Sequence, residues 1–153
     1  MNHIEYMREA LKEAEKAASL GEVPIGAVLV DNASGQIISR GYNLREKKRD
    51  PLAHAEIIAI KNAAQILNKW RLTGTTLYVT VEPCPMCAGA VLQSRIDRVV
   101  YGAPDPKAGA AGSLIDILRD ERFNHQAQVI PFVLEEECRN IIQRFFRNLR
   151  ERG

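Results

Sequence analysis

The sequence lacks the features of membrane-spanning, secreted and disulfide-stapled proteins. No apolar run approaches the length of a membrane span, and the segment Met1-Asn2-His3-Ile4-Glu5 lacks the basic-then-apolar layout of a secretory signal. Three cysteines, two in a tight pair and one near the C-terminus, do not make a disulfide framework. We therefore expect a cytoplasmic chain with reduced thiols and no membrane contact.

Excess charge is also missing, because the formal net charge of the 153 residues is only +2. That sum does not predict a polyanionic partner, but the basic residues are clustered. One cluster lies at 45–49 and another runs from Arg139 to the C-terminus. Contact with phosphate and plain solvation explain these clusters equally well. Length and an ordinary composition, with 46% hydrophobic and 26% charged residues, favour one domain over residues 1–153.

Hydrophobic periodicity predicts a layered α/β fold. A hairpin is predicted at 24–41, where turn residues connect an apolar run at 24–30 to a second strand at 36–41. A strand, a helix and a strand over 75–101 predict a parallel pair with a right-handed crossover. The predicted helices are 5–18, 52–67, 85–94 and 135–150, and the predicted strands are 24–30, 36–41, 75–81, 96–101 and 129–133.

Several local features leave their interpretation open. Gly26 and Ala27 are small enough for a buried helix, or a flat ring, to approach the first strand closely. A lone residue such as Asn43 is by default a surface turn residue. Asp50 and Pro51 predict the N-cap and first position of the helix at 52–67, whose opening turns would then carry His54, Ala55 and Glu56.

The stretch Pro83-Cys84-Pro85-Met86-Cys87 predicts a strand-to-helix turn in which Pro85 opens the helix. Both sulfurs then face the same way, and the positive end of the helix favours the thiolates that a metal needs. Together with His54 they make three ligands. Tetrahedral zinc takes four, and a catalytic zinc site leaves the fourth position to water.

Glu56 lies two positions from His54, a spacing that points the two side chains to different sides of a regular helix. It would therefore not be an equivalent ligand. A carboxylate there can take a proton from zinc-bound water and deliver it to a leaving amine, which is hydrolytic deamination. A His-x-Glu sequence followed by Pro-Cys-x-x-Cys is the known signature of the zinc nucleobase deaminases.

Each part of this signature also has a simpler interpretation. A Cys-x-x-Cys pair alone fits a thioredoxin-like redox site or half of a zinc knuckle. A histidine at a helix start is often a surface residue. The order and spacing of all four residues favour the catalytic zinc site.

Beyond the zinc motif, the sequence resembles the bacterial tRNA-specific adenosine deaminases over nearly its whole length. Guanine, riboflavin-pathway, cytidine and deoxycytidylate deaminases share the zinc motif, but typically lack the glycine-alanine loop at 109–114 with Asp105-Pro106-Lys107 before it. The matching stretches are residues 22–28, 53–56, 76–84, 86–90 and 109–114.

The resemblance implies a three-layer α/β/α cytidine deaminase-like fold around a five-stranded mixed sheet, with one zinc ion per subunit and a homodimer. The implied reaction converts adenosine to inosine at the wobble position of a tRNA anticodon, in an arginine isoacceptor. Zinc-bound hydroxide would attack C6 of the flipped adenine, with Glu56 as proton shuttle. A deaminase of a free base or nucleoside such as guanine or cytidine is the first alternative, and a non-catalytic zinc or RNA-binding module the second.

The same resemblance assigns the remaining site residues. Backbone N–H groups of Ala55 and Cys84 would hold the attacked base, Asn43 would hydrogen-bond the base or its ribose, and Ala27 would lie near the ring. The other implied RNA contacts are Asp105 and Lys107, to nucleotides flanking the target, and Phe145, Arg147 and Arg150 on the C-terminal helix, beside the anticodon stem-loop.

Overall fold

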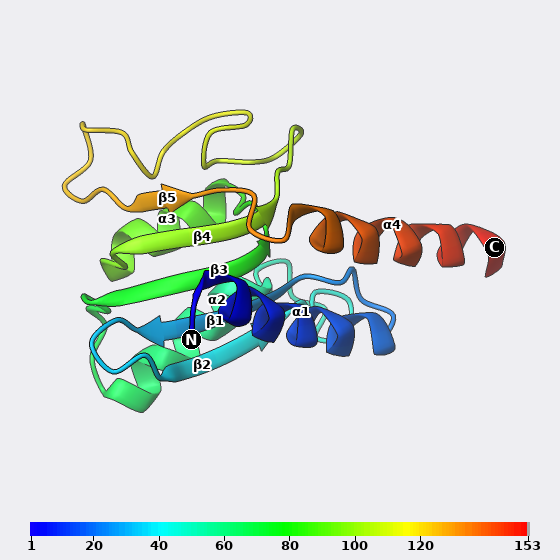
Figure 1. The fold of residues 1–153 in the computed structure, drawn as a ribbon, viewed down its shortest axis with the longest axis horizontal. Coiled ribbons are helices and arrows are strands. Elements are labelled where there is room, and N and C mark those ends of the chain that lie inside the picture. Colours follow the sequence, from blue (N-terminus) through cyan, green and yellow to red (C-terminus); the bar gives the residue numbers. More distant parts are fainter. Residues whose placement is uncertain (153) are drawn as a thin grey trace.

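A five-stranded mixed sheet runs through the middle of the molecule, with strand order β2-β1-β3-β4-β5 (Figure 1). The structure is a computed structural model and describes residues 1–152. The elements are α1 (His3–Ser19), β1 (Gly26–Asp31), β2 (Ile37–Tyr42), α2 (Ala55–Leu67), β3 (Thr75–Val81), α3 (Pro85–Ser94), β4 (Arg98–Ala103), β5 (Gln128–Ile130) and α4 (Glu135–Arg152).

The strand pairing confirms the predicted topology. β1 is antiparallel to both β2 and β3, so the first two strands form the predicted hairpin. β3 and β4 are parallel and are connected through α3, and β5 adds to β4 in parallel. β5 is displaced from its predicted position and ends at Ile130, because Pro131 has no N–H for a ladder and Phe132 adopts a positive φ of 66°.

The helices cover the sheet on both faces, which confirms the three-layer α/β/α fold. α1 and α4 lie in front of the sheet in the view of Figure 1, and α2 and α3 lie behind it. The front core joins Met7 and Ala10 of α1 to Val28, Tyr78 and Val100 of the sheet. The rear core joins α2 and α3 to the opposite sheet face, through Ala55, Ala59, Ala88, Val91, Leu29, Leu77 and Val99.

Gly26 lets α1 lie directly on the first strand. A Cβ at this position would come within 2.1 Å of the Ala10 carbonyl oxygen and 2.4 Å of the Ala14 nitrogen. Both are backbone atoms, so no side-chain rotation would relieve the clash. Of the two interpretations of the small residues in β1, the packed helix accounts for Gly26.

The predicted start of α2 is wrong. The helix begins at Ala55, and its N-cap residue is His54, with extended φ and ψ of −79° and 153°. Asp50 instead closes a short turn, in which its Oδ1 accepts a hydrogen bond from the Leu52 N–H at 2.9 Å. His54 therefore lies before the helix and not within its first turns.

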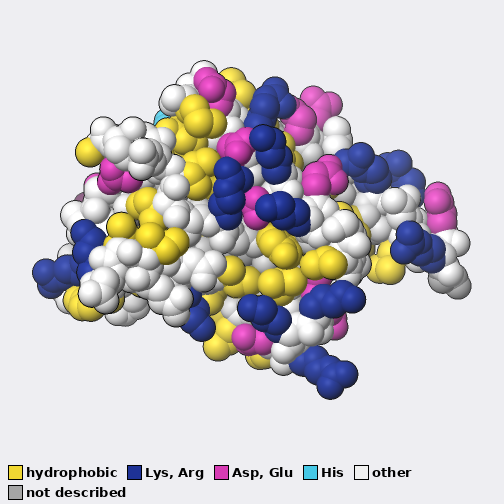
Figure 2. All heavy atoms as spheres, turned by 90° about the horizontal axis from the view of Figure 1, so that it is seen from below, with side chains coloured by type: hydrophobic (Ala, Val, Ile, Leu, Met, Phe, Trp, Pro, Cys, Tyr) yellow, Lys and Arg dark blue, Asp and Glu magenta, His cyan; other side chains and the backbone are white. Residues whose placement is uncertain are grey.

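The surface of the molecule is mixed in character. The face shown in Figure 2 interleaves basic, acidic and hydrophobic side chains, as the small net charge suggests. α4 projects beyond the ends of the strands, so its last turns extend away from the sheet (Figure 1). Within residues 1–152, no helix has both the length and the apolar character needed to cross a bilayer.

Candidate active site

Two helix N-termini bring together the predicted metal ligands. His54 is the N-cap residue of α2 and Cys84 the N-cap residue of α3, with Cys87 in the first turn of α3. Nδ1 of His54 lies 3.7 Å from Sγ of Cys84 and 3.5 Å from Sγ of Cys87. Cys87 is buried, and His54 and Cys84 are half-buried. The structure thus assembles all three residues that the sequence singled out as ligands.

The spacing of these atoms fits a tetrahedral metal ion. Bonds of about 2.3 Å to sulfur and about 2.05 Å to nitrogen, at a tetrahedral angle, place the two donor atoms about 3.6 Å apart. The two nitrogen–sulfur distances of 3.7 and 3.5 Å lie on either side of that value. Two thiolates and an imidazole are also a donor set that zinc prefers. The three side chains, called the metal-binding group below, could therefore hold a metal ion.

The electrostatics of the group favour a thiolate at Cys84. The pKa of Cys84 is lowered to about 4, mainly because the Cys87 thiol hydrogen-bonds to its sulfur, and the His54 ring adds to this against the effect of burial. The same contact with Cys84, together with burial, raises the pKa of Cys87. Contact with Cys84 also raises the pKa of His54. Thiolate is the form of cysteine that binds metals.

Glu56 is the buried carboxyl group beside this cluster. It is the second residue of α2, is 4% exposed, and its side chain contacts the Cys87 thiol. Burial raises its pKa to about 7, and the negative Cys84 sulfur contributes to the rise. Because His54 precedes the helix, the two side chains meet at the same cluster, although regular helical spacing would have separated them.

Asn43 is buried rather than a surface turn residue. It follows β2 and is 8% exposed. Its Nδ2 donates to the Val23 carbonyl at 3.2 Å and its Oδ1 accepts from the Arg45 N–H at 3.1 Å, so it joins the loops on either side of the hairpin. An asparagine amide carries two N–H groups, and these contacts use one of them. Its predicted contact with the base stays a prediction.

Ala27 and Ala55 have no exposed surface. Ala27 lies in β1 opposite Val79 and belongs to the rear core. Ala55 opens α2, where the first N–H groups of a helix lack intrahelical acceptors, so its backbone is suited to the predicted hydrogen bond. The predicted contact between the Ala27 side chain and the ring gains no support from its burial.

Asp105 and Lys107 lie in the loop after β4. The Asp105 Oδ1 accepts hydrogen bonds from the N–H groups of Lys107 at 3.1 Å and Ala108 at 3.2 Å, so this carboxylate shapes its own loop. Lys107 is exposed. An exposed cation held on a turn of fixed shape is compatible with the predicted contact to RNA.

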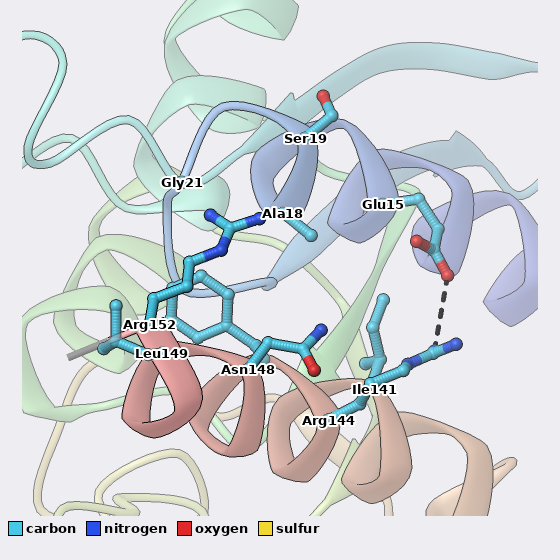
Figure 3. A pocket seen from close by; sticks show the side chains of 10 residues that line it. Glu15, Ala18, Ser19, Gly21, Ile141, Arg144, Asn148, Leu149 and Arg152 are labelled. Atoms are coloured by element: carbon cyan, nitrogen blue, oxygen red, sulfur yellow. Dashed lines mark ion pairs between the residues drawn. The ribbon is translucent and has the colours of Figure 1, made fainter.

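The structure separates the three residues predicted on α4. Phe145 lines a groove of about 390 Å³ between α1 and α4, where Arg144 forms an ion pair with Glu15 at 3.7 Å (Figure 3). Arg147 and Arg150 line a different hollow on the same helix. Phe145 and the two arginines therefore face different surroundings. That all three contact RNA stays a prediction.

Two buried carboxylates were missed by the sequence interpretation. Glu22 is 1% exposed and accepts hydrogen bonds from the N–H groups of Glu46 and Lys47 at 3.1 and 2.6 Å. Glu82 is 3% exposed; burial opposes its ionisation, but hydrogen bonds from Ser113, Asp105 and Ala111 lower its pKa below the ordinary value. Glu22 thus holds the loop that leads to His54, and Glu82 holds the loop that contacts Pro83. Both lie within stretches already matched to the family, which was the only signal in the sequence.

Comparison with known proteins identifies the family. Residues 1–150 match the MafB19-like deaminase family. A tRNA-specific adenosine deaminase of Bacillus subtilis (strain 168) is 58% identical over 147 residues, covering 96% of this chain and 90% of that protein. The chain belongs to the tRNA-specific adenosine deaminase family. It is accordingly a deaminase, and the resemblance inferred from its motifs is confirmed.

Solved structures of relatives agree with the fold. A structure from a study of A-to-I editing by tRNA:A34 deaminases matches with a TM-score of 0.85 and 43% identity, covering 90% of this chain and 98% of the other. A guanine deaminase from Nitrosomonas europaea matches with a TM-score of 0.81 at 22% identity, covering 93% of this chain and 83% of the other. The fold is thus shared with a deaminase of another substrate, and fold alone does not define the substrate of a tRNA-specific adenosine deaminase.

Proposed function

We propose that this protein converts adenosine to inosine at the wobble position of a tRNA anticodon by zinc-dependent hydrolysis. Membership of the tRNA-specific adenosine deaminase family supports the substrate and the reaction. The observation that carries the mechanism is the meeting of three metal-ligand atoms with the buried carboxyl group of Glu56. We infer a single deaminase domain over residues 1–153.

His54, Cys84 and Cys87 would hold the zinc ion, since their donor atoms all lie within 4.8 Å of one another. When bound, zinc supplies a Lewis acid that lowers the pKa of a water ligand towards about 7. Three protein ligands would leave one coordination position for that water. His54 and Cys84 are the N-cap residues of α2 and α3, so two helices support the ligands.

Glu56 would move the protons. Replacing the C6 amino group by oxygen consumes one water and releases one ammonia, so one hydrogen of the water ends on ring N1 and the other on the leaving nitrogen. A carboxyl group with a pKa of about 7 can take and return each of these protons near neutral pH. Its burial next to Cys87 keeps bulk water from competing for them.

Recognition of RNA would rest on the loops around the metal-binding group. Asn43 and the Ala55 N–H would bind the base, while Asp105 and Lys107 would contact its neighbours. Phe145, Arg147 and Arg150 would approach the anticodon stem, of an arginine isoacceptor by the family resemblance. We also infer a homodimer and a cytoplasmic location. The location is supported by the free thiols of Cys84, Cys87 and Cys138.

Product analysis on matched substrates tests this proposal. The protein would be incubated with an anticodon stem-loop carrying wobble adenosine, with the same stem-loop carrying its adenosine elsewhere, and with free adenosine, guanine and cytidine. We expect inosine only in the first RNA, measured by mass spectrometry of the nucleosides after digestion. Turnover of a free base or nucleoside without turnover of the RNA would establish the alternative substrate class. Molar mass in solution, measured by light scattering, tests the homodimer.

A further inference from the structure

Glu82 links the turn at 83–87, which carries Cys84 and Cys87, to the loop 105–113, which is more than 20 residues away in the sequence. It directly follows β3 and is 3% exposed. Its Oε1 accepts a hydrogen bond from the Asp105 N–H at 3.0 Å, and its Oε2 accepts from the N–H groups of Ala111 at 2.9 Å and Ser113 at 3.1 Å. The Ser113 hydroxyl donates to Oε1 as well. One carboxylate thus receives four hydrogen bonds from the loop 105–113.

The loop 105–113 also packs against this carboxylate. A Cβ on Gly109 would lie 2.4 Å from Cδ of Glu82 and 2.5 Å from the Asp105 carbonyl oxygen, so only glycine allows the loop so close. The Ala110 N–H donates to the Pro83 carbonyl at 2.9 Å. Pro83 directly precedes the metal-ligand Cys84. Loop and turn therefore form one connected unit, with Glu82 at its centre.

The contacts of Glu82 determine where the loop presents its polar groups. Its bond to the Asp105 N–H fixes the residue whose own carboxylate orders Lys107 and Ala108. Buried N–H groups without an acceptor are costly, so loss of the carboxylate would force the loop into another shape. The three predicted metal ligands receive none of the four hydrogen bonds that Glu82 accepts.

We propose that Glu82 is a positioning residue for the RNA substrate, which holds the loop 105–113 in the shape that presents Asp105 and Lys107 to nucleotides beside the target base. Glu82 does so without touching RNA or metal, since it is buried beneath the loop. This inference rests on the proposed function, because it concerns how the same site selects RNA.

Glu82→Gln is the central variant. The side-chain amide keeps the shape of the carboxyl group but has one acceptor oxygen and an NH₂ group that faces N–H donors. We expect KM for the anticodon stem-loop to rise about tenfold, because a buried donor left unpaired costs about as much as a tenfold change in binding. kcat and the zinc content are expected to stay close to those of the unchanged protein.

Gly109→Ala approaches the same contact from the loop side and is expected to raise KM in the same direction, which keeps the proposal testable if Glu82→Gln folds poorly. The rise in KM caused by Ser113→Ala combined with Glu82→Gln should be smaller than the sum of the two single effects, in free energy, because both changes remove the same hydrogen bond.

Glu13→Gln is the matched control. Glu13 is a buried carboxylate on α1, ion-paired with Lys16 and Arg40 and outside the loop, so its replacement should leave KM unchanged.

The outcomes separate the two proposals. If the unchanged protein edits the stem-loop and Glu82→Gln lowers only the active fraction, with the same KM, Glu82 is merely structural and the inference is wrong. Strict additivity with Ser113→Ala would also contradict it. If the unchanged protein shows no turnover of the stem-loop, the proposed function itself fails.

Discussion

The Sγ atom of Cys84 and the Nδ1 atom of His54 lie 3.7 Å apart, although 30 residues separate them in the chain. Each residue is the N-cap of a helix, and both helices pack on the rear face of the sheet. The ligand geometry is thus set by the ends of two rigid elements. Sites supported in this way hold their geometry better than sites on loops.

Metal binding is expected to depend on the pair of sulfurs near His54. The purified protein should contain about one zinc ion per chain by elemental analysis, and Cys84→Ser should lose most of it, because the thiolate is a far better ligand than a hydroxyl. Cys138→Ser is the control, since Cys138 lies on α4 and is buried in the front core, on the opposite face of the sheet from α2 and α3. Equal zinc in both variants would contradict the assigned ligands.

Glu56→Gln is expected to abolish most of the activity while leaving the metal in place. Loss of a proton shuttle lowers kcat by roughly 100-fold to 10,000-fold. Single-turnover rates on the stem-loop, together with zinc analysis of the same sample, measure both properties. Glu121→Gln, an exposed carboxyl group far from the cluster in sequence, should match the unchanged protein. A zinc-loaded Glu56→Gln protein with an undiminished rate would remove Glu56 from the mechanism.

Gly26→Ala is expected to destabilise the fold. The added methyl group would lie 2.1 Å from the Ala10 carbonyl oxygen, so α1 has to move off the sheet. Overpacking of this kind lowers the free energy of unfolding by about 1–3 kcal/mol, which urea denaturation can measure. Gly89→Ala in α3 provides the comparison, because within residues 1–152 its Cβ would meet no atom within 4 Å other than its chain neighbours and the nearby backbone of α3. That change should be neutral or add about 0.5–1 kcal/mol.

Cys138 is expected to resist alkylation in the native protein. Burial raises the pKa of this thiol to about 12, so its reactive thiolate is scarce at pH 8 and increases about tenfold for each unit that the pH rises. Modification by iodoacetamide should be about a thousandfold slower than in urea, where the thiol returns to its ordinary pKa of about 8.5. Peptide mass spectrometry follows the reaction. Equal rates in both states would show that this region opens readily.

Much of the fold could be predicted because local signals agreed. The bounds of β3 and α3 match their predictions, since a run rich in β-branched and aromatic residues forms the strand and Pro85 is suited to the first position of a helix. The start of α2 was predicted too early. Asp50 makes the same kind of side-chain contact to a following N–H in a turn as it would at an N-cap, and the sequence does not distinguish the two.

The supports of the candidate site could not be predicted from local patterns. Glu82 and Glu22 look like ordinary surface charges in the sequence, but both are buried, and their partners are backbone N–H groups more than 20 residues away. Backbone donors carry no sequence signature. Asn43 shows the same limit, since only its tertiary contacts distinguish it from a turn residue on the surface.

The strand order links the folding of the chain to the formation of the metal-binding group. β3 lies in the centre of the sheet, between the antiparallel β1 and the parallel β4. Cys84 follows β3, whereas His54 precedes α2, which packs on β1 and β2. The metal ligands meet only after the hairpin half and the crossover half of the sheet have joined. Tight zinc binding would therefore report the completion of folding, and a chain arrested before β3 is in place would hold the ion only weakly.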